Sequence, residues 1–151
     1  MNAEIFRMPG HLINRAARQL QRIGDERYLR LGLAIAQVPV LRDLKDGNAK
    51  SQIELARLAN VEQPTMAQLL GRMERDGLIR RSSNPRDKRS SLVRLTAKAR
   101  TKLPEAMAVL LEGNTIALKG FSEREIASFT QLLARVNANL DEYRRQQEGA
   151  D

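Results

Sequence analysis

The chain has 151 residues, no cysteine and a net charge of +8. This length fits one modest domain with a real core, and the lack of cysteine excludes disulfides, thiolate metal sites and thiol-based redox sensing. No apolar run reaches the roughly eighteen residues of a membrane span, and the first ten residues lack the apolar stretch of a secretion signal. We therefore expect a cytoplasmic protein without membrane contact.

The first third of the chain predicts two helices. Residues 11 to about 30 carry apolar side chains at helical spacing, and the pair at 31–32 marks a break. A second helix is expected over 33–45, where an almost continuous apolar pattern indicates burial on most sides. Pro39 should either kink that helix or mark its first turn. The residues at 46–48, Asp-Gly-Asn, form a clear turn.

A short helix is predicted to start after Ser51. Ser51 and Glu54 form the S-x-x-E pattern, in which the serine and the glutamate reciprocally cap a helix start. The apolar residues that follow give this helix a buried face. Asn60 falls where the next turn needs a residue that tolerates the left-handed region.

A second short helix is expected to begin around Pro64. Proline suits the first helical position, and the preceding Gln63 should adopt an extended cap conformation. Gly77 closes the helix as a left-handed cap. One side carries residues spaced for burial, namely Met66, Leu69, Leu70 and Met73. The other side is polar and suits a major groove, where glutamine pairs with adenine and arginine with guanine or phosphate; it holds Thr65, Gln68, Arg72 and Arg75.

Two basic strands are expected after this helix, over 78–83 and 91–95. The loop between them, 84–90, starts with an Asn-Pro turn signal and carries three basic residues at its tip: Arg86, Lys88 and Arg89. Such a ribbon suits a minor groove, whose negative potential attracts arginine. A basic hairpin alone is more often a solvated loop, but a helix-turn-helix followed by a wing in one run is a much stronger signal.

The positive charge is concentrated in one part of the chain. Residues 72–102 contain eleven basic and three acidic side chains, and this excess of eight positive charges equals the net charge of the whole chain. The basic and acidic residues in the rest of the chain are equal in number. A generic basic protein would spread this excess. Its position at the end of the second short helix, along the wing and at the start of the next helix indicates a polyanion partner, and DNA fits best.

Two long helices follow the wing. Thr96 should cap the first, which runs to about residue 118 with a further kink expected at Pro104, and a second capping box at Ser122 starts the last, which runs to about residue 147. Both carry long apolar stripes. These stripes either pack against one another within the chain or form a dimer interface. We favour the dimer because palindromic operators require two-fold symmetric proteins.

Residues 54–96, ELARLANVEQPTMAQLLGRMERDGLIRRSSNPRDKRSSLVRLT, resemble the winged-helix core of the multiple antibiotic resistance regulator (MarR) family. The most specific parts are the E-L-A start, the M-E-R-D-G-L-I-R-R passage, the D-K-R wing tip and the closing L-T. The resemblance implies a mainly α fold with a small β-hairpin wing. A single domain over 1–151 would then hold a winged helix-turn-helix at about 48–100. N- and C-terminal dimerisation helices would flank it at about 4–30 and 101–147.

The resemblance also implies a homodimeric transcription regulator, usually a repressor, that binds a pseudo-palindromic operator in double-stranded DNA. Asp87 would hold Arg89, and Arg89 would enter the minor groove. Thr65, Gln68 and Arg72 match the groove-facing positions of the family. The full predicted DNA-binding set is Gln63, Thr65, Met66, Gln68, Arg72, Arg75, Arg86, Asp87, Lys88 and Arg89.

Many members of the family bind small aromatic acids between the dimer interface and the winged module, and this weakens their grip on DNA. His11 and Arg15, one helical turn apart, could together anchor a carboxylate. The alternative is that His11 is a surface or capping residue and Arg15 a solvated charge. Gln37 is a third candidate for effector binding. After it, Val38 and Pro39 replace the aromatic residue common in the family, so the pocket floor should differ.

Other functions fit the sequence less well. A non-specific architectural nucleic-acid protein would also need the basic patch, but its binding face would favour lysine over Thr65 and Gln68. A protein-interaction module has no obvious use for the localised charge. An enzyme is least expected, since one histidine, no cysteine and no paired carboxylates leave no recognisable catalytic constellation. No cofactor or metal is predicted.

Overall fold

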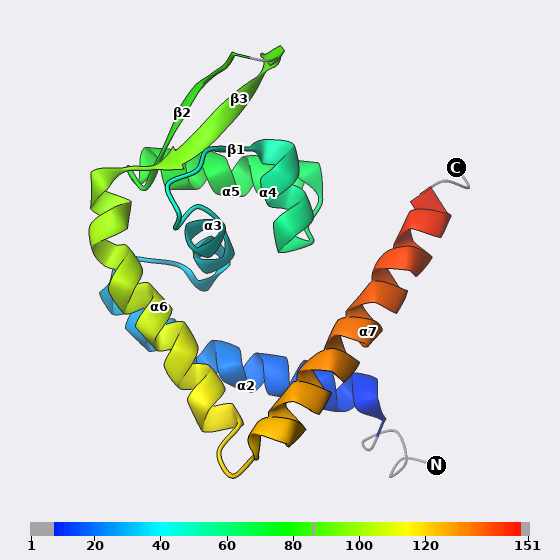
Figure 1. Cartoon of the computed structure of the whole chain (residues 1–151). Coiled ribbons are helices and arrows are strands. Elements are labelled where there is room, and N and C mark those ends of the chain that lie inside the picture. The colour runs from blue at the N-terminus through cyan, green and yellow to red at the C-terminus, as the bar shows by residue number, and fades with distance from the viewer. Residues whose placement is uncertain (1–7, 86, 149–151) are drawn as a thin grey trace. The chain divides into compact units, whose positions relative to one another are not determined.

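The computed structural model describes residues 8–85 and 87–148, with the side chains of residues 87–89 and 148 outside that description. The fold is mainly helical with a small antiparallel sheet, as the sequence predicted (Figure 1). Its contacts define two compact units, residues 1–114 and 115–151. The elements are α2 (Pro9–Arg30), the 3-10 helix η1 (Ile35–Gln37), α3 (Val38–Asp43), β1 (Lys50–Ser51), α4 (Gln52–Ala59), α5 (Gln63–Arg75), β2 (Ile79–Asn84), β3 (Asp87–Leu95), α6 (Ala97–Ala117) and α7 (Glu123–Glu148).

The predicted helix over 33–45 is wrong in extent. The chain is extended at Ala34, forms the single 3-10 turn η1, and is α-helical only over α3. Pro39 lies in the first turn of α3. Because proline has no N–H to donate to the preceding turn, it cannot sit inside a longer helix without losing a hydrogen bond. Pro39 therefore marks a first turn, one of the two outcomes expected of it.

The predicted break before this segment is confirmed. Gly32 has φ +65°, and the N–H of Leu33 donates to the carbonyl of Tyr28 at 2.8 Å. Only glycine adopts this left-handed conformation without steric cost from a side chain. The chain can therefore leave α2 sharply and enter η1.

The sheet has the order β1-β3-β2. The two-residue strand β1 was not predicted, and β3 begins at Asp87, so the expected loop over 84–90 is wrong in length. An irregular register at Ser83 and Asn84 brings Asn84 opposite Asp87. Such an irregularity lets the hairpin turn within fewer residues, and the amide of Asn84 donates to the hydroxyl of Ser90 at 2.8 Å.

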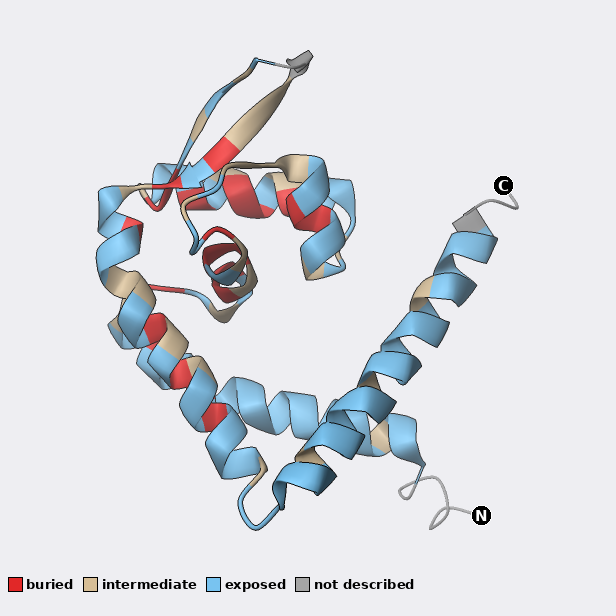
Figure 2. Cartoon of the chain, in the orientation of Figure 1, coloured by how far each residue is buried: buried red, intermediate tan, exposed pale blue. Residues whose placement is uncertain are grey.

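The core of the first unit lies where α3, α4, α5, the sheet and the first half of α6 meet, and the burial colours of Figure 2 show it. Leu41, Leu55, Leu70 and Val93 are among its fully buried residues. Burial of this kind supplies most of the folding free energy of a small domain. The winged module is therefore a packed body that can hold side chains at fixed positions.

Both predicted capping boxes are present. At the start of α4, the N–H and the hydroxyl of Ser51 donate to the carboxylate of Glu54 at 2.6 and 2.8 Å. These two bonds stabilise the ionised carboxylate and hold the pKa of Glu54 below its usual value. Ser122 and Glu125 repeat the arrangement at the start of α7.

The second unit presents an apolar stripe on α7. Figure 2 shows α7 exposed over almost its whole length. Its large apolar residues are exposed in the single chain, and they are Phe129, Leu132, Val136, Leu140 and Tyr143. A contiguous apolar stripe of this size commonly marks an interaction site. Among the described residues, no helix is both long and apolar enough to cross a membrane.

Candidate nucleic-acid interface

Helix α5 separates its two faces cleanly. Leu69, Leu70 and Met73 are buried on its inner side, while the outer side exposes Gln63, Thr65, Gln68, Arg72 and Arg75. Met66 has no exposed surface, so its place among the predicted DNA contacts is wrong. It lies three residues before Leu69, and residues three apart share a helix face. The outer face is polar, with no large apolar side chain that would resist a wet groove.

The turn between α4 and α5 is fixed by local bonds. Asn60 adopts the predicted left-handed conformation at φ +52°, and the N–H of Val61 donates to the carbonyl of Ala56 at 3.0 Å. Glu62, and not Gln63 as predicted, is the extended cap of α5. Pro64 then occupies the second helical position, which equally needs no N–H donor. The angle of α5 against α4 therefore follows from a short, well-bonded turn.

The C-terminal end of α5 is held from the next helix. Lys98 donates through Nζ to the carbonyl of Asp76 at 2.7 Å, and the hydroxyl of Thr96 donates to the carbonyl of Gly77 at 2.6 Å. The same hydroxyl accepts the N–H of Ala99 at 3.2 Å, which caps α6 as predicted. These bonds satisfy carbonyls that a helix end leaves without partners. They also tie the exit of α5 to the start of α6.

The wing carries the remaining predicted contacts. Arg86 lies outside the described residues, as do the side chains of Asp87, Lys88 and Arg89, whose backbone belongs to β3. The structure therefore places the backbone of Asp87, Lys88 and Arg89 on strand β3. Arg81 at the base of the wing lies with Nε 3.3 Å from Oε2 of Glu74, an ion pair that lacks the alignment of a hydrogen bond and connects β2 with α5.

Sequence reasoning did not single out a basic cleft at the base of the wing. Arg80 and Arg94 are exposed and directly opposite each other on β2 and β3, so they share a face of the sheet. Arg80 and Arg100 also line a cleft of about 340 Å³. Like charges placed opposite one another destabilise a sheet, and an anion between them would relieve this repulsion. The pairing of Arg80 with Arg94 depends on the register of the hairpin. The sequence could have predicted it only if the length of the wing loop had been predicted correctly.

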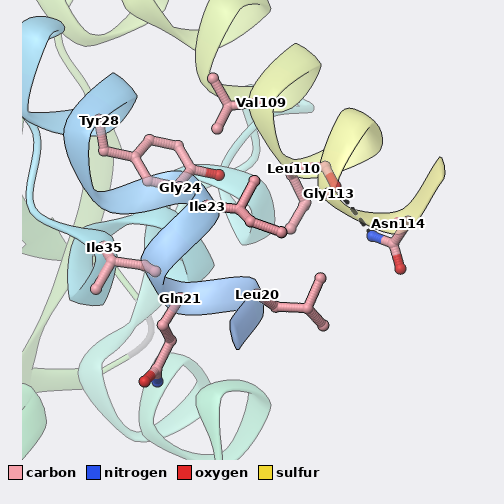
Figure 3. A pocket seen from close by; sticks show the side chains of 10 residues that line it. All are labelled: Leu20, Gln21, Ile23, Gly24, Tyr28, Ile35, Val109, Leu110, Gly113 and Asn114. Atoms are coloured by element: carbon pink, nitrogen blue, oxygen red, sulfur yellow. Dashed lines mark hydrogen bonds between the residues drawn. The ribbon is translucent and has the colours of Figure 1, made fainter. Parts of the chain in front are cut away.

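A separate cavity of about 130 Å³ lies within the first unit, between α2, η1 and α6 (Figure 3). Its lining is mostly apolar and consists of Leu20, Gln21, Ile23, Gly24, Tyr28, Ile35, Val109, Leu110, Gly113 and Asn114. The hydroxyl of Tyr28 donates to the carbonyl of Ala106 at 3.4 Å. Burial raises the pKa of Tyr28, although the charge of Arg27 opposes this, so the phenol stays neutral at physiological pH.

None of the three predicted effector residues lines this cavity. His11 is half-buried and Arg15 exposed, both in the first half of α2. Val38, expected in the pocket floor, is buried in the core instead. Gln37 is buried and hydrogen-bonded on both sides: its Oε1 accepts the N–H of Ala34 at 2.9 Å, and its Nε2 donates to Asp76 at 3.2 Å. The cavity was missed because its walls come from helices about 85 residues apart in the chain.

The fold is a winged helix-turn-helix. Helices α4 and α5 form the helix-turn-helix, with a polar outer face on α5, and strands β2 and β3 form the basic wing. The MarR family profile matches residues 33–91. The transcriptional regulator SlyA superposes with a TM-score of 0.80 at 28% identity, over 86% of this chain and 92% of that one. A MarR family regulator from Listeria monocytogenes, solved with 26-mer DNA, gives 0.81 at 28%, over 86% and 87%. A mutant of MarR from E. coli, solved with operator DNA, gives 0.76 at 25%, over 84% and 91%.

These matches extend beyond the winged module to most of the chain. The profile identifies the winged core, and the superpositions include the flanking helices. The winged core of the chain is therefore similar to that of the MarR family of transcriptional regulators, as its sequence suggested.

Proposed function

We propose that this protein is a homodimeric, sequence-specific DNA-binding regulator of the cytoplasm that represses transcription, and not an enzyme. The observation that carries the proposal is the outer face of α5, where five exposed polar residues stand on a fully packed inner face. The relatives solved with DNA support the same partner. A helix of this kind reads base edges in a major groove.

The contacts divide into two kinds. Thr65, Gln68 and Arg72 would contact bases, since their side chains match the donors and acceptors of the major groove. Arg75, Arg94 and the two arginines that line the cleft, Arg80 and Arg100, would contact phosphates, which position the protein without reading sequence. At the wing tip, Asp87 would hold Arg89 for insertion into the minor groove, and Arg86 and Lys88 would add phosphate contacts.

The proposed dimer would form through the helices outside the winged module. The exposed stripe of α7 is the strongest candidate for the interface, because its apolar side chains repeat along one face of a 26-residue helix. A two-fold dimer would present two copies of α5 to half-sites separated by a whole number of helical turns. A non-specific architectural protein remains the competing function, supported by the basic cleft but not by the side chains of Thr65 and Gln68.

A titration against DNA separates these two functions. The protein should bind the duplex upstream of its own gene more tightly than a scrambled duplex of equal length and composition. The logarithm of affinity should fall with the logarithm of salt concentration by about 0.9 per phosphate neutralised. Arg89→Ala should weaken binding markedly and leave the fold unchanged by circular dichroism. Equal affinity for the upstream and the scrambled duplex, measured at a low and at a high salt concentration, would favour the architectural function.

The chemistry of the cavity points to a neutral effector. The lining residues include no charged side chain, so a carboxylate would lose its hydration without gaining a partner. The cavity volume is of the order that admits a single benzene ring, for which about 150 Å³ is known to suffice. We therefore propose a small uncharged aromatic ligand that lowers DNA affinity, in place of the aromatic acid that the family resemblance implied.

Phenol and benzoate test the ligand class directly, because they share a ring and differ in charge at neutral pH. Millimolar phenol should weaken operator binding several-fold, and benzoate at the same concentration and ionic strength should not. Fluorescence anisotropy of a labelled operator duplex measures both. If benzoate acts and phenol does not, the ligand is an acid and the residues near His11 and Arg15 become the better candidates.

A further inference from the structure

The side chain of Gln37 joins η1 to the end of the recognition helix α5. Gln37 is only 5% exposed. Among the residues that the structure describes, no other polar or charged residue is buried. Through Oε1 it caps the start of its own turn by accepting the N–H of Ala34, and through Nε2 it donates to Oδ2 of Asp76. A buried amide with both ends bonded restricts the motion of everything it connects.

The opposite side of the same turn forms part of the cavity. Ile35 lines the cavity together with Tyr28 and Gly24, and Figure 3 shows these three side by side. A 3-10 helix has three residues per turn, so residues two positions apart point to different sides. Ile35 therefore faces the cavity while Gln37 faces α5. Because η1 is a single hydrogen-bonded turn, a displacement of Ile35 also displaces Gln37.

Asp76 connects this turn to the DNA-facing side chains. It is the C-cap of α5, and its N–H donates to the carbonyl of Arg72 at 2.9 Å. Arg72 lies one turn upstream on the outer face. A shift of Asp76 therefore moves the last turn of α5, which carries Arg72 and Arg75.

We propose that Gln37 is a positioning residue that couples the occupancy of the cavity to the placement of the last turn of α5. This inference rests on the proposed function, both for DNA binding through α5 and for a ligand in the cavity. With the cavity empty, the Gln37–Asp76 bond holds α5 in its DNA-binding position. An occupant that displaces Ile35 or Tyr28 moves η1, strains this bond and lowers the affinity for the operator.

Gln37→Glu breaks this connection selectively. The glutamate keeps an oxygen for the N–H of Ala34, but it places a second carboxylate oxygen against Asp76 where Nε2 donated before. Combining it with Asp76→Asn restores a hydrogen bond of reversed polarity, from the new amide to the new carboxylate. Gln37→Met removes both bonds without adding a charge. We expect operator affinity about tenfold weaker in the two single variants of Gln37 and recovered in the double variant.

Gly24→Ala imitates a permanent occupant of the cavity. A Cβ at Gly24 would lie 2.7 Å from Cε2 of Tyr28 and 3.8 Å from Cδ1 of Ile35, so the tyrosine ring must move. The decisive measurement is a cycle of four proteins: wild type, Gly24→Ala, Gln37→Glu and both together. Each is titrated with operator and with scrambled duplex, in the presence and absence of phenol.

In the wild-type background, Gly24→Ala and phenol should each weaken operator binding by about fivefold or more, the usual lower range of coupling between two sites. In the Gln37→Glu background each should change it by less than about twofold. A role of Gln37 in stability alone would shift the unfolding temperature without changing these ratios, so thermal unfolding is measured beside each titration.

Equal factors in both backgrounds would overturn the inference, as would a wild-type affinity that neither Gly24→Ala nor phenol alters. Failure of the double variant of Gln37 and Asp76 to recover affinity would also count against it. Equal wild-type affinity for operator and scrambled duplexes would instead refute the proposed function, and the inference would fall with it. The wild-type titrations thus distinguish the two failures.

Discussion

Leu132→Asp combined with Leu140→Asp is expected to convert the protein to monomers and to weaken operator binding by about a hundredfold or more. The two leucines are 54% and 61% exposed in the single chain and lie on one stripe of α7. Buried against a partner, each aspartate would be an uncompensated charge. Binding two half-sites through linked modules exceeds binding one by factors of about 10² to 10⁴, and a monomer loses this gain.

Gln131→Asp is the matched control for this prediction. Together with Ala138→Asp it introduces the same two charges on the same helix, on the side opposite the stripe. Light scattering after size-exclusion chromatography should show monomers for the double variant and dimers for the control, and circular dichroism should show equal helicity. A double variant that remains dimeric would place the interface elsewhere, and then the apolar residues exposed along α2 become the alternative.

The sequence predicted the helix-turn-helix closely because its signals are local. The capping box of Ser51, the left-handed Asn60 and the terminal Gly77 each act within one turn of their own position. Their effects do not depend on distant contacts. The alternation of buried and exposed residues on α5 is local in the same sense, which is why the exposed residues of its outer face could be named from the sequence. Met66 was the exception, since the same periodicity placed it inside.

The features that sequence reasoning missed depend on residues far apart in the chain. Strand β1 has two residues and forms only because Lys50 and Ser51 meet Val93 and Leu92. The bond between Gln37 and Asp76 spans 39 positions. Gln37 was named only as a candidate for effector binding, whereas it does not line the cavity and is a buried amide with a partner on each side. The distant partner is a carboxylate at the end of α5, a choice that only the packing of η1 against that helix determines.

The chemistry of the cavity points to a different ligand class from the one that the family resemblance implied. The resemblance implied an aromatic acid, and His11 with Arg15 was the pair that could anchor its carboxylate. The cavity lies further along α2 and is lined mostly by apolar side chains, with two neutral amides, those of Gln21 and Asn114. A binding site selects its ligand through the polar groups it must satisfy. Because no cationic side chain is among the residues that line this cavity, a neutral ligand is the one proposed for it.

Arg72→Ala is expected to weaken operator binding by about 1–3 kcal/mol, roughly 5- to 150-fold, and to relax the preference for one base pair in each half-site. The side chain is exposed at the last turn of α5, on the face that carries Thr65 and Gln68. There its guanidinium can donate two parallel hydrogen bonds to guanine. Anisotropy titrations against the operator and a set of duplexes with single base-pair changes give both quantities.

Arg72→Lys separates base reading from simple charge. Lysine keeps the positive charge but lacks the planar fork that makes two parallel bonds. It should lose the base preference and retain nearly the wild-type salt dependence, whereas Arg72→Ala should reduce both. Arg30→Ala, which removes an arginine from a loose, exposed ion pair at the end of α2, controls for net charge. If Arg72→Ala weakens binding to all duplexes by one factor, Arg72 contacts phosphate, and the reading of bases passes to Thr65 and Gln68.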